Sequence, residues 1–215
     1  MSNIVLPKKT KEGYYLSNSQ VTKWHNDRRG YIRQYIYGEP FDGNDYTRFG
    51  NKVGKALEKG VYRGFTAEEK KFLATIPRYD EFEKHVKLEM DGFFIKGYID
   101  TNTFDGKLLA DYKTGSIDTK TPYYSSDQYF QLDLYAEALR REHGEFPEEV
   151  NVFLIGRSGN PFRGEKLKLT QEFKAIPRKV DKKRVKKVLK HVQQTAEQIS
   201  EHYKVFLKLK GEEIC

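Results

Sequence analysis

The stretch "GYIDTNTFDGKLLADYKTG", from Gly97 to Gly115, decides the fold. Its two apolar runs flank Asp105-Gly106, a dipeptide that strongly signals a two-residue β-hairpin turn. Counting outward from this turn places Asp100 directly opposite Asp111. Directly opposed residues project from the same sheet face, with Cβ atoms roughly 4.5–5.5 Å apart. The sequence therefore predicts two carboxylates side by side.

Lys113 projects from the same face as Asp111, because side chains in a strand alternate with period two. Two adjacent carboxylates repel each other unless a cation lies between them, and their hard oxygens suit Mg²⁺ or Mn²⁺. Such an ion lowers the pKa of a bound water, and Lys113 would orient that water or stabilise the charge of the transition state. The cluster predicts metal-assisted phosphodiester hydrolysis. A solvated cross-strand ion pair is the alternative that spacing alone leaves open.

The remaining patterns predict helices and strands around this hairpin. Apolar residues at helical spacing, with caps and Gly or Pro stops, predict helices over about 17–38, 46–60, 66–76, 125–144 and 181–209. Alternating patterns predict strands over about 82–90, 93–100, 107–112, 149–157 and 162–170, with Asp91-Gly92 as the first hairpin turn. The order of elements predicts a mixed sheet flanked by helices.

Length and composition bound the class of protein. The chain has 215 residues and a formal net charge of +8. A chain of this length favours a single domain, and the basic balance favours a polyanionic partner. The one cysteine, Cys215, excludes a disulfide or a four-cysteine metal site within one chain. No run approaches the ~20 apolar residues of a membrane span, so a cytoplasmic protein is expected.

Positive charge gathers in two segments. Between Lys174 and Lys210, twelve Lys or Arg residues face three Asp or Glu residues. This segment predicts a helix that tracks phosphates, with contacts from Lys182, Lys183, Lys186 and Lys187. Near the N-terminus, Arg28, Arg29 and Arg33 alternate with Trp24, Tyr31 and Tyr35, a pattern that suits phosphate contacts and base stacking. The alternative for Trp24 and Tyr31 is an ordinary core position, which we favour.

Three motifs in order resemble the RecB-type branch of the PD-(D/E)XK nuclease superfamily, including its lambda-exonuclease-like members. These are "GYID", "LLADYKTG" and "QLDLYAEAL". The resemblance implies an α/β (α+β) fold with a restriction-endonuclease-like core. It also implies a metal-binding role for Asp100 and Asp111, a catalytic role for Lys113, and roles for Gln131 and Tyr135, which share a helix face. For Tyr135, a plain core position is the alternative.

The chain departs from the family where a helix normally supplies a histidine or glutamate to the metal. Gly54 occupies that position, and Glu58, one turn further on, is the candidate that could replace the missing ligand. Glu83 lies where relatives often carry an acid, and is expected to be a surface residue of an edge strand. The absence of further cysteines sets the chain apart from the iron–sulfur members of the branch.

The resemblance implies a Mg²⁺- or Mn²⁺-dependent deoxyribonuclease, and an exonuclease rather than an endonuclease, in DNA recombination, repair or phage DNA processing. Its expected partners are DNA and a recombination or single-strand-binding protein, with an oligomer as an option, in the cytoplasm of a bacterial or phage-infected cell. In lambda-exonuclease-like relatives an arginine near the N-terminus meets a 5′-phosphate, which suggests Arg28 or Arg29. The alternatives are a catalytically impaired nucleic-acid-binding protein and a structure-specific endonuclease. The expected parts are a helical segment over 1–80, a catalytic sheet over 81–170 and a basic helix over 171–215.

Overall fold

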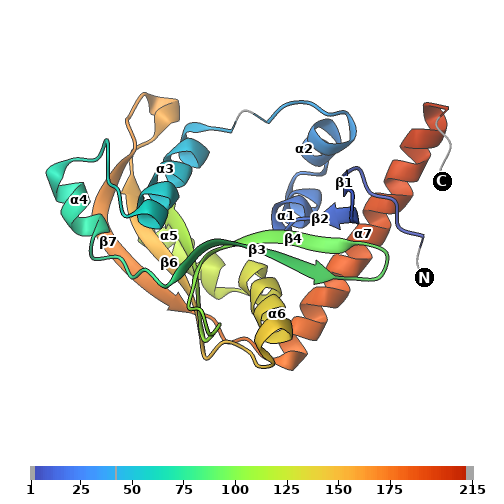
Figure 1. The fold of residues 1–215 in the computed structure, drawn as a ribbon. Helices are drawn as coiled ribbons and strands as arrows, with labels where there is room; N and C mark the ends of the chain where they lie inside the picture. The colour runs from blue at the N-terminus through green and yellow to red at the C-terminus, as the bar shows by residue number, and fades with distance from the viewer. Residues whose placement is uncertain (1–2, 42, 212–215) are drawn as a thin grey trace. The chain divides into compact units, whose positions relative to one another are not determined.

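The computed structural model describes residues 3–41 and 43–211, so Cys215 lies outside the described residues. The described chain forms two compact units, each assembled from separated segments (Figure 1). We call residues 43–84 and 98–181 the site unit, and residues 3–41, 85–97 and 182–211 the terminal unit. Strands β3 (Glu81–Glu89) and β4 (Phe94–Asn102) pass from one unit into the other. The expectation of one domain in three parts stays a prediction.

The site unit contains a mixed sheet. Besides the ends of β3 and β4, it holds α3 (Asp45–Lys59), α4 (Ala67–Leu73), β5 (Leu108–Gly115), α5 (Ile117–Ser125), α6 (Gln131–His143), β6 (Glu149–Ser158), η2 (Pro161–Arg163) and β7 (Lys168–Pro177). Strand β5 runs antiparallel to β4 and parallel to β6, and β7 runs antiparallel to β6. The predicted α/β fold with a mixed sheet and flanking helices is confirmed.

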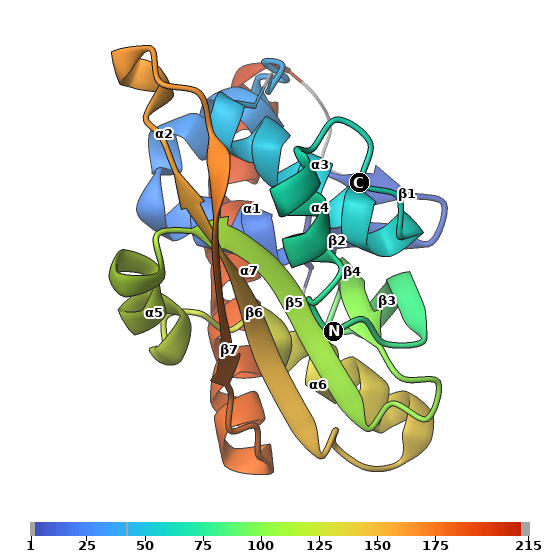
Figure 2. The same cartoon turned by 90° about the vertical axis from the view of Figure 1, so that its left-hand side faces the viewer.

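Helices cover both faces of this sheet, as Figure 2 shows for β5 and β6. On one face, Ile155 of β6 packs with Val53 and Leu57 of α3 and with Leu73 of α4. The side chain of Asp111 in β5 contacts α6 instead, through Gln131. Strand β6 is buried continuously from Val152 to Ile155, as a strand covered on both sides must be. The core of the site unit therefore surrounds β6, the strand paired with the one that carries the acidic motif.

The second hairpin turn differs from the predicted one, although its register does not. The Gly106 amide donates to Thr103 O over 2.9 Å, and Gly106 has the left-handed φ of +71° that this turn requires. Four residues, not two, therefore separate the paired residues Thr103 and Leu108. Pairing of Thr101 with Ala110 and of Asn102 with Leu109 preserves the predicted register. The first hairpin turn, around Asp91-Gly92, is confirmed by the bond from Met90 N to Phe93 O over 2.9 Å.

The terminal unit holds the N-terminal and C-terminal helices. Its elements are β1 (Lys9–Thr10), β2 (Gly13–Leu16), α1 (Asn18–Asn26), α2 (Arg28–Tyr31), a π-helical turn η1 (Ile32–Ile36) and α7 (Lys182–Leu209). The predicted first helix is wrong as one element, because it breaks at Asp27, whose carboxylate caps α2 at Gly30 N over 2.9 Å. Helix α1 contacts α7 through a hydrogen bond from Trp24 Nε1 to Gln198 Oε1, 3.1 Å long.

Two further boundaries differ from those that the sequence predicts. The helix predicted from about 125 begins at Gln131, and the separate helix α5 precedes it. The strand predicted over 162–170 lies at Lys168–Pro177, because η2 occupies its expected start. The strands β1 and β2 were not predicted.

None of the helices within residues 3–41 and 43–211 combines the length and apolarity of a membrane span.

Candidate active site

Asp111 is the centre of the candidate site. Its side chain is fully buried, and both carboxylate oxygens accept hydrogen bonds. Gln131 Nε2 donates to Oδ1 over 2.9 Å, and the Tyr129 hydroxyl donates to Oδ2 over 2.8 Å. The ammonium of Lys113 lies 2.5 Å from Oδ2. These donors fix the carboxylate in an orientation that needs no bound ion to hold it.

Asp100 lies beside this acid, at the point where β4 and β5 separate. The β4–β5 pairing ends at Thr101 and Ala110, and the Asp100 carboxylate then accepts the Tyr112 amide over 2.7 Å. Burial and the charge of Asp111 raise the pKa of Asp100 from 3.8 to about 7, against the opposing charge of Lys113. The charge of Asp111 therefore disfavours the charged form of Asp100.

Lys113 completes the cluster. Burial alone would lower the pKa of Lys113, but the charges of Asp111 and Asp100 outweigh it and raise that pKa above its ordinary 10.5. The ammonium is therefore charged at neutral pH and interacts with both acids. Its side chain is 27% exposed, whereas that of Asp111 is not exposed at all. Lys113 is thus the more exposed member of this pair.

The tyrosines around Asp111 include one that sequence reasoning missed. Tyr129 donates to Asp111, yet it stands alone before helix α6 and belongs to no motif in the sequence. Tyr135 is 5% exposed, and its hydroxyl accepts from Gln131 Nε2 over 3.2 Å. Burial and the charge of Asp111 raise the pKa of Tyr135 to about 12. Gln131 and Tyr135 lie next to Asp111, although their catalytic roles stay predictions.

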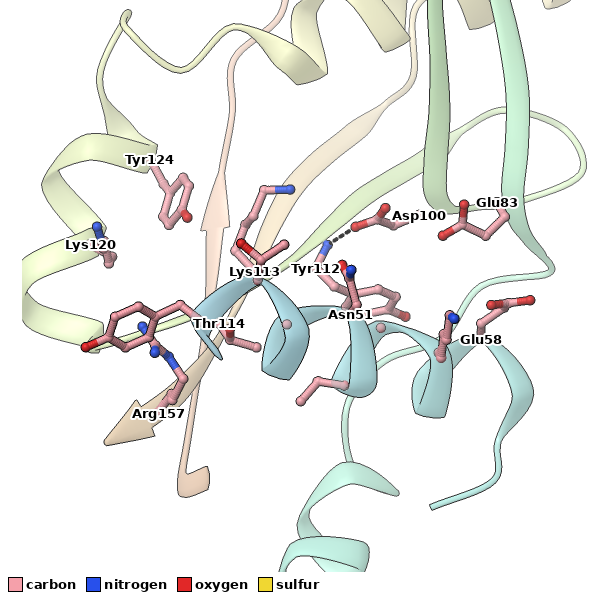
Figure 3. Close-up of a pocket in the computed structure, with 16 residues that line it drawn as sticks. Asn51, Glu58, Glu83, Asp100, Tyr112, Lys113, Thr114, Lys120, Tyr124 and Arg157 are labelled. Atoms are coloured by element: carbon pink, nitrogen blue, oxygen red, sulfur yellow. Dashed lines mark hydrogen bonds between the residues drawn. The ribbon is translucent and has the colours of Figure 1, made fainter. Parts of the chain in front are cut away.

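A pocket of about 720 Å³ opens beside this cluster, and its three carboxylates lie apart from Lys120 and Arg157 (Figure 3). Asp100, Glu83 and Glu58 lie toward one end, with Lys113 and Asn51 nearer the middle. Lys120, Tyr124, Thr114 and Arg157 gather at the other end. One end thus suits a cation, and the other suits an anion.

Glu83 is exposed, as predicted, and it also lines the acidic end of the pocket. Its backbone has a φ of +51°, which is strained for a residue with a side chain, and Glu83 adds to the charge that raises the pKa of Asp100. Partial burial and the charge of Glu58 raise the pKa of Glu83 itself. Glu83 thus combines a left-handed backbone with a carboxylate that points into the pocket. Figure 3 shows this carboxylate facing Asp100.

The donor set fits a hard divalent ion. Mg²⁺ commonly uses one or two carboxylates and completes its shell with water and phosphate oxygens. Asp100 and Asp111 supply two carboxylates, and the charge of Asp111 disfavours that of Asp100 when no cation is bound. Within residues 3–41 and 43–211, no three His, Cys, Asp or Glu side chains form a group that could hold a metal. The proposed ligation by Glu58 therefore stays a prediction.

Gly54 also lines the pocket, on the side formed by α3. A Cβ built on Gly54 would meet no atom within 4 Å. The position where the family resemblance implies a metal ligand therefore faces open space in this chain.

A second hollow, of about 460 Å³, lies along α3 in the same unit. It shares Asn51 and Lys55 with the first pocket. Its charged lining residues are all cations: Arg48, Lys52, Lys55, Lys59 and Arg63. Sequence analysis did not identify this basic face, because its cations interleave with the apolar residues of an ordinary amphipathic helix.

The other predicted nucleic-acid contacts belong to the terminal unit. Lys182, Lys183, Lys186 and Lys187 are exposed on α7, while Val185 and Val188 between them are buried. This arrangement confirms the amphipathic pattern.

The predicted arginines near the N-terminus are exposed too. Arg28 lies 4.4 Å from the Trp24 ring centroid, and Arg33 pairs with Glu39 over 2.7 Å. Arg29 is exposed on α2. Trp24 and Tyr31 are buried, which confirms their core positions. The nucleic-acid contacts of these residues stay predictions.

The chain is similar to known proteins in sequence and in fold. Gene 69 protein of Mycobacterium phage D29 is 35% identical over 80 residues, which are 36% of this chain and 27% of that protein. The match thus spans about a quarter of the phage protein. A suspected exonuclease from Eubacterium rectale has a TM-score of 0.57 at 15% identity, over 92% of this chain and 87% of the other. A phage-related exonuclease from Haemophilus somnus has a TM-score of 0.46 at 14% identity, over 89% and 81%.

The structure from Eubacterium rectale supports the assignment of the α/β fold. A family model described as the PD-(D/E)XK nuclease superfamily matches residues 22–210, which include every member of the Asp111 cluster. The chain therefore belongs to the PD-(D/E)XK nuclease superfamily.

Proposed function

We propose that this protein is a Mg²⁺- or Mn²⁺-dependent deoxyribonuclease that hydrolyses phosphodiester bonds from DNA ends. The observation that carries the proposal is the cluster of Asp100, Asp111 and Lys113 beside a pocket with one acidic and one basic end. Membership of a nuclease superfamily supports nucleic acid as the substrate. The finer proposal is an exonuclease in recombination, repair or phage DNA processing in the cytoplasm.

Asp100 and Asp111 would hold the ion, and Glu83 would add negative charge at the same end of the pocket. The bound ion would supply a water of lowered pKa and positive charge against the phosphate. Gln131 and Tyr129 keep the Asp111 carboxylate in place by donating to its two oxygens. Preorganisation of this kind avoids reorienting the ligand during the reaction.

Lys113 would act on the phosphate. Its ammonium is charged at neutral pH because Asp111 and Asp100 raise its pKa, so we assign it charge stabilisation rather than the role of a general base. From its contact with Asp111 Oδ2 it can donate to a non-bridging phosphate oxygen or to the attacking water. Its replacement by methionine should lower the rate by roughly 10²–10³, the loss typical of one preorganised donor at a developing anion.

The test is cleavage of end-labelled linear duplex, covalently closed circular and single-stranded DNA in Mg²⁺, Mn²⁺ or EDTA. We expect cleavage of linear substrates by the wild type and none in EDTA. Asp111→Asn and Lys113→Met should lose cleavage and keep DNA affinity within a few-fold. Asp105→Asn and Lys107→Gln are the matched controls, because both residues are exposed on the same hairpin. Full cleavage by Lys113→Met would refute the mechanism.

A second candidate function is DNA binding without cleavage. The open space at Gly54, where relatives carry a metal ligand, favours it. This alternative predicts DNA binding by the wild type with no product in either ion. Circular DNA cut as readily as linear DNA would favour an endonuclease instead. Gel filtration with and without a single-strand-binding protein would test the oligomer and the proposed partner.

A further inference from the structure

Arg157 is a half-buried cation with two buried nitrogen atoms that make no hydrogen bond within the described chain. It belongs to the end of β6, and its Nε and Nη1 atoms are buried without a hydrogen-bond partner among the residues that the structure describes. An unpaired buried donor typically costs about 1–3 kcal/mol, and more when it is charged. A planar guanidinium matches the oxygens of a phosphate group. Such a group would satisfy both atoms.

The surroundings of Arg157 also favour an anion. Its guanidinium lies 4.2 Å from the centroid of the Tyr46 ring, at the start of α3. Burial lowers the pKa of Arg157, and the phenols of Tyr46 and Tyr124 act in the opposite direction. Figure 3 shows Arg157 at the end of the pocket away from Asp100. The carboxylates of the pocket are therefore not its partners.

The backbone is shaped to place Arg157 there. The pairing of β6 with β7 shifts register between Ile155 and Arg157, where Gln171 of β7 has a φ of +60°. A Cβ on the intervening Gly156 would lie 2.1 Å from Thr170 Oγ1, so the bulge needs a glycine opposite it. Bulges of this kind re-aim side chains next to functional sites.

An exposed aromatic ring lies near Tyr46, the ring that Arg157 contacts. Phe162, in the turn between β6 and β7, is 84% exposed, and its ring lies 6.1 Å from that of Tyr46. Asn160 Oδ1 accepts from Phe162 N over 3.1 Å and from the Tyr46 hydroxyl over 3.4 Å. Asn160 therefore fixes the turn against α3 while the Phe162 ring stays in solvent. An exposed ring of this kind suits stacking on an unpaired base.

We propose that Arg157, Tyr46 and Phe162 form a nucleotide subsite for a single-stranded segment of the substrate. Arg157 binds a phosphate next to the scissile one, Tyr46 supports the guanidinium, and Phe162 stacks on the base. The inference rests on the proposed function for the identity of the ligand, a nucleic acid strand that continues from the metal-binding end of the pocket. It adds that this strand is unpaired where it passes Phe162.

The test uses fluorescein-labelled 12-nucleotide single strands and the matching duplex, in EDTA, with anisotropy as the readout. Arg157→Gln should weaken binding of the single strand by about tenfold or more, the loss of one charge-assisted contact. Phe162→Ala should weaken it by about tenfold, and Phe162→Tyr should restore it. Strands with 2-aminopurine at successive positions should show one base that is quenched by the wild type and not by Phe162→Ala. Arg163→Gln is the matched control, because Arg163 is exposed in the same turn.

Thermal unfolding without DNA separates a ligand-binding arginine from a structural one. Because Arg157 has buried unpaired atoms, Arg157→Gln should unfold at the same or a higher temperature than the wild type. A clear fall in that temperature would overturn the inference, as would single-strand affinities for Arg157→Gln and Phe162→Ala equal to that of Arg163→Gln. If the wild type cleaves no DNA and Arg157→Gln still loses single-strand binding, the proposed nuclease is refuted and the subsite is supported. If Arg157→Gln cleaves and binds DNA as the wild type does, the nuclease is supported and the subsite is refuted.

Discussion

Replacing Asp100 by asparagine tests the electrostatics of the acidic pair directly. Burial and the charge of Asp111 raise the pKa of Asp100 from 3.8 to about 7. Between those values the folded protein holds a proton that the unfolded chain releases, so the free energy of unfolding falls as pH rises through this window. At about 1.36 kcal/mol per pKa unit, the fall amounts to at most about 4 kcal/mol at pH 8.

Asp100→Asn removes this pH-dependent loss of stability and keeps a side-chain oxygen that can accept the hydrogen bond from the Tyr112 amide. In EDTA at pH 8 the variant should therefore unfold roughly 10 °C above the wild type, from about 2–4 °C per kcal/mol for a chain of this length. At pH 4, where Asp100 is protonated in the folded protein, the difference should nearly vanish. Circular dichroism melts at the two pH values measure both.

Asp105→Asn is the control on the same hairpin. Hydrogen bonds from the Thr103 hydroxyl and the Lys107 amide lower the pKa of Asp105, so its replacement should not stabilise the protein. With Mn²⁺ at 100 times its dissociation constant, the wild type should gain about 2.7 kcal/mol that Asp100→Asn lacks. The reasoning is refuted if Asp100→Asn melts with the wild type at pH 8 in EDTA, or gains as much at pH 4.

Three further changes test other parts of the site unit. Gly54→Glu should raise the free energy of unfolding by about 0.5–1 kcal/mol, because glycine weakens a helix interior. It should also tighten Mn²⁺ binding in calorimetry. An unchanged affinity for Mn²⁺ would mean that this position does not face the ion. Gly156→Ala should instead cost about 1–3 kcal/mol in denaturant unfolding, since its Cβ would lie 2.1 Å from Thr170 Oγ1, and a neutral result would contradict the described bulge. Neutralising Lys52, Lys55 and Lys59 on the basic face of α3 should flatten the salt dependence of DNA binding by roughly 0.7–0.9 per lost phosphate contact. If the slope stays unchanged and falls only when the four lysines of α7 are neutralised, the DNA backbone contacts α7 instead.

The register of the acidic pair was predictable although its turn was not. Lengthening a hairpin loop by one residue on each side leaves the remaining pairs opposite each other, so Asp100 and Asp111 keep their relation. The family resemblance singled out Gln131 and Tyr135, and their spacing of four within a helix places them on one face, which is also a local property. The sequence therefore predicts the parts of the site that depend on local geometry.

The parts that were missed depend on contacts between distant residues. Arg157 meets Tyr46 from more than a hundred positions away, and nothing local marks either residue. Helix α5 contains Pro122 and has little apolar periodicity, so its sequence resembles a loop. Tyr129 precedes its helix without a motif. Single residues of this kind become recognisable only when packing brings them to a common partner.

The hydrogen bond from the Tyr112 amide to the Asp100 carboxylate gives the protein an intrinsic spectroscopic reporter. A backbone amide held by a titrating side chain changes its proton chemical shift when that side chain gains a proton or an ion. In an ¹⁵N-labelled sample, one cross-peak should therefore record ion occupancy and acidity at the reaction centre without any attached probe.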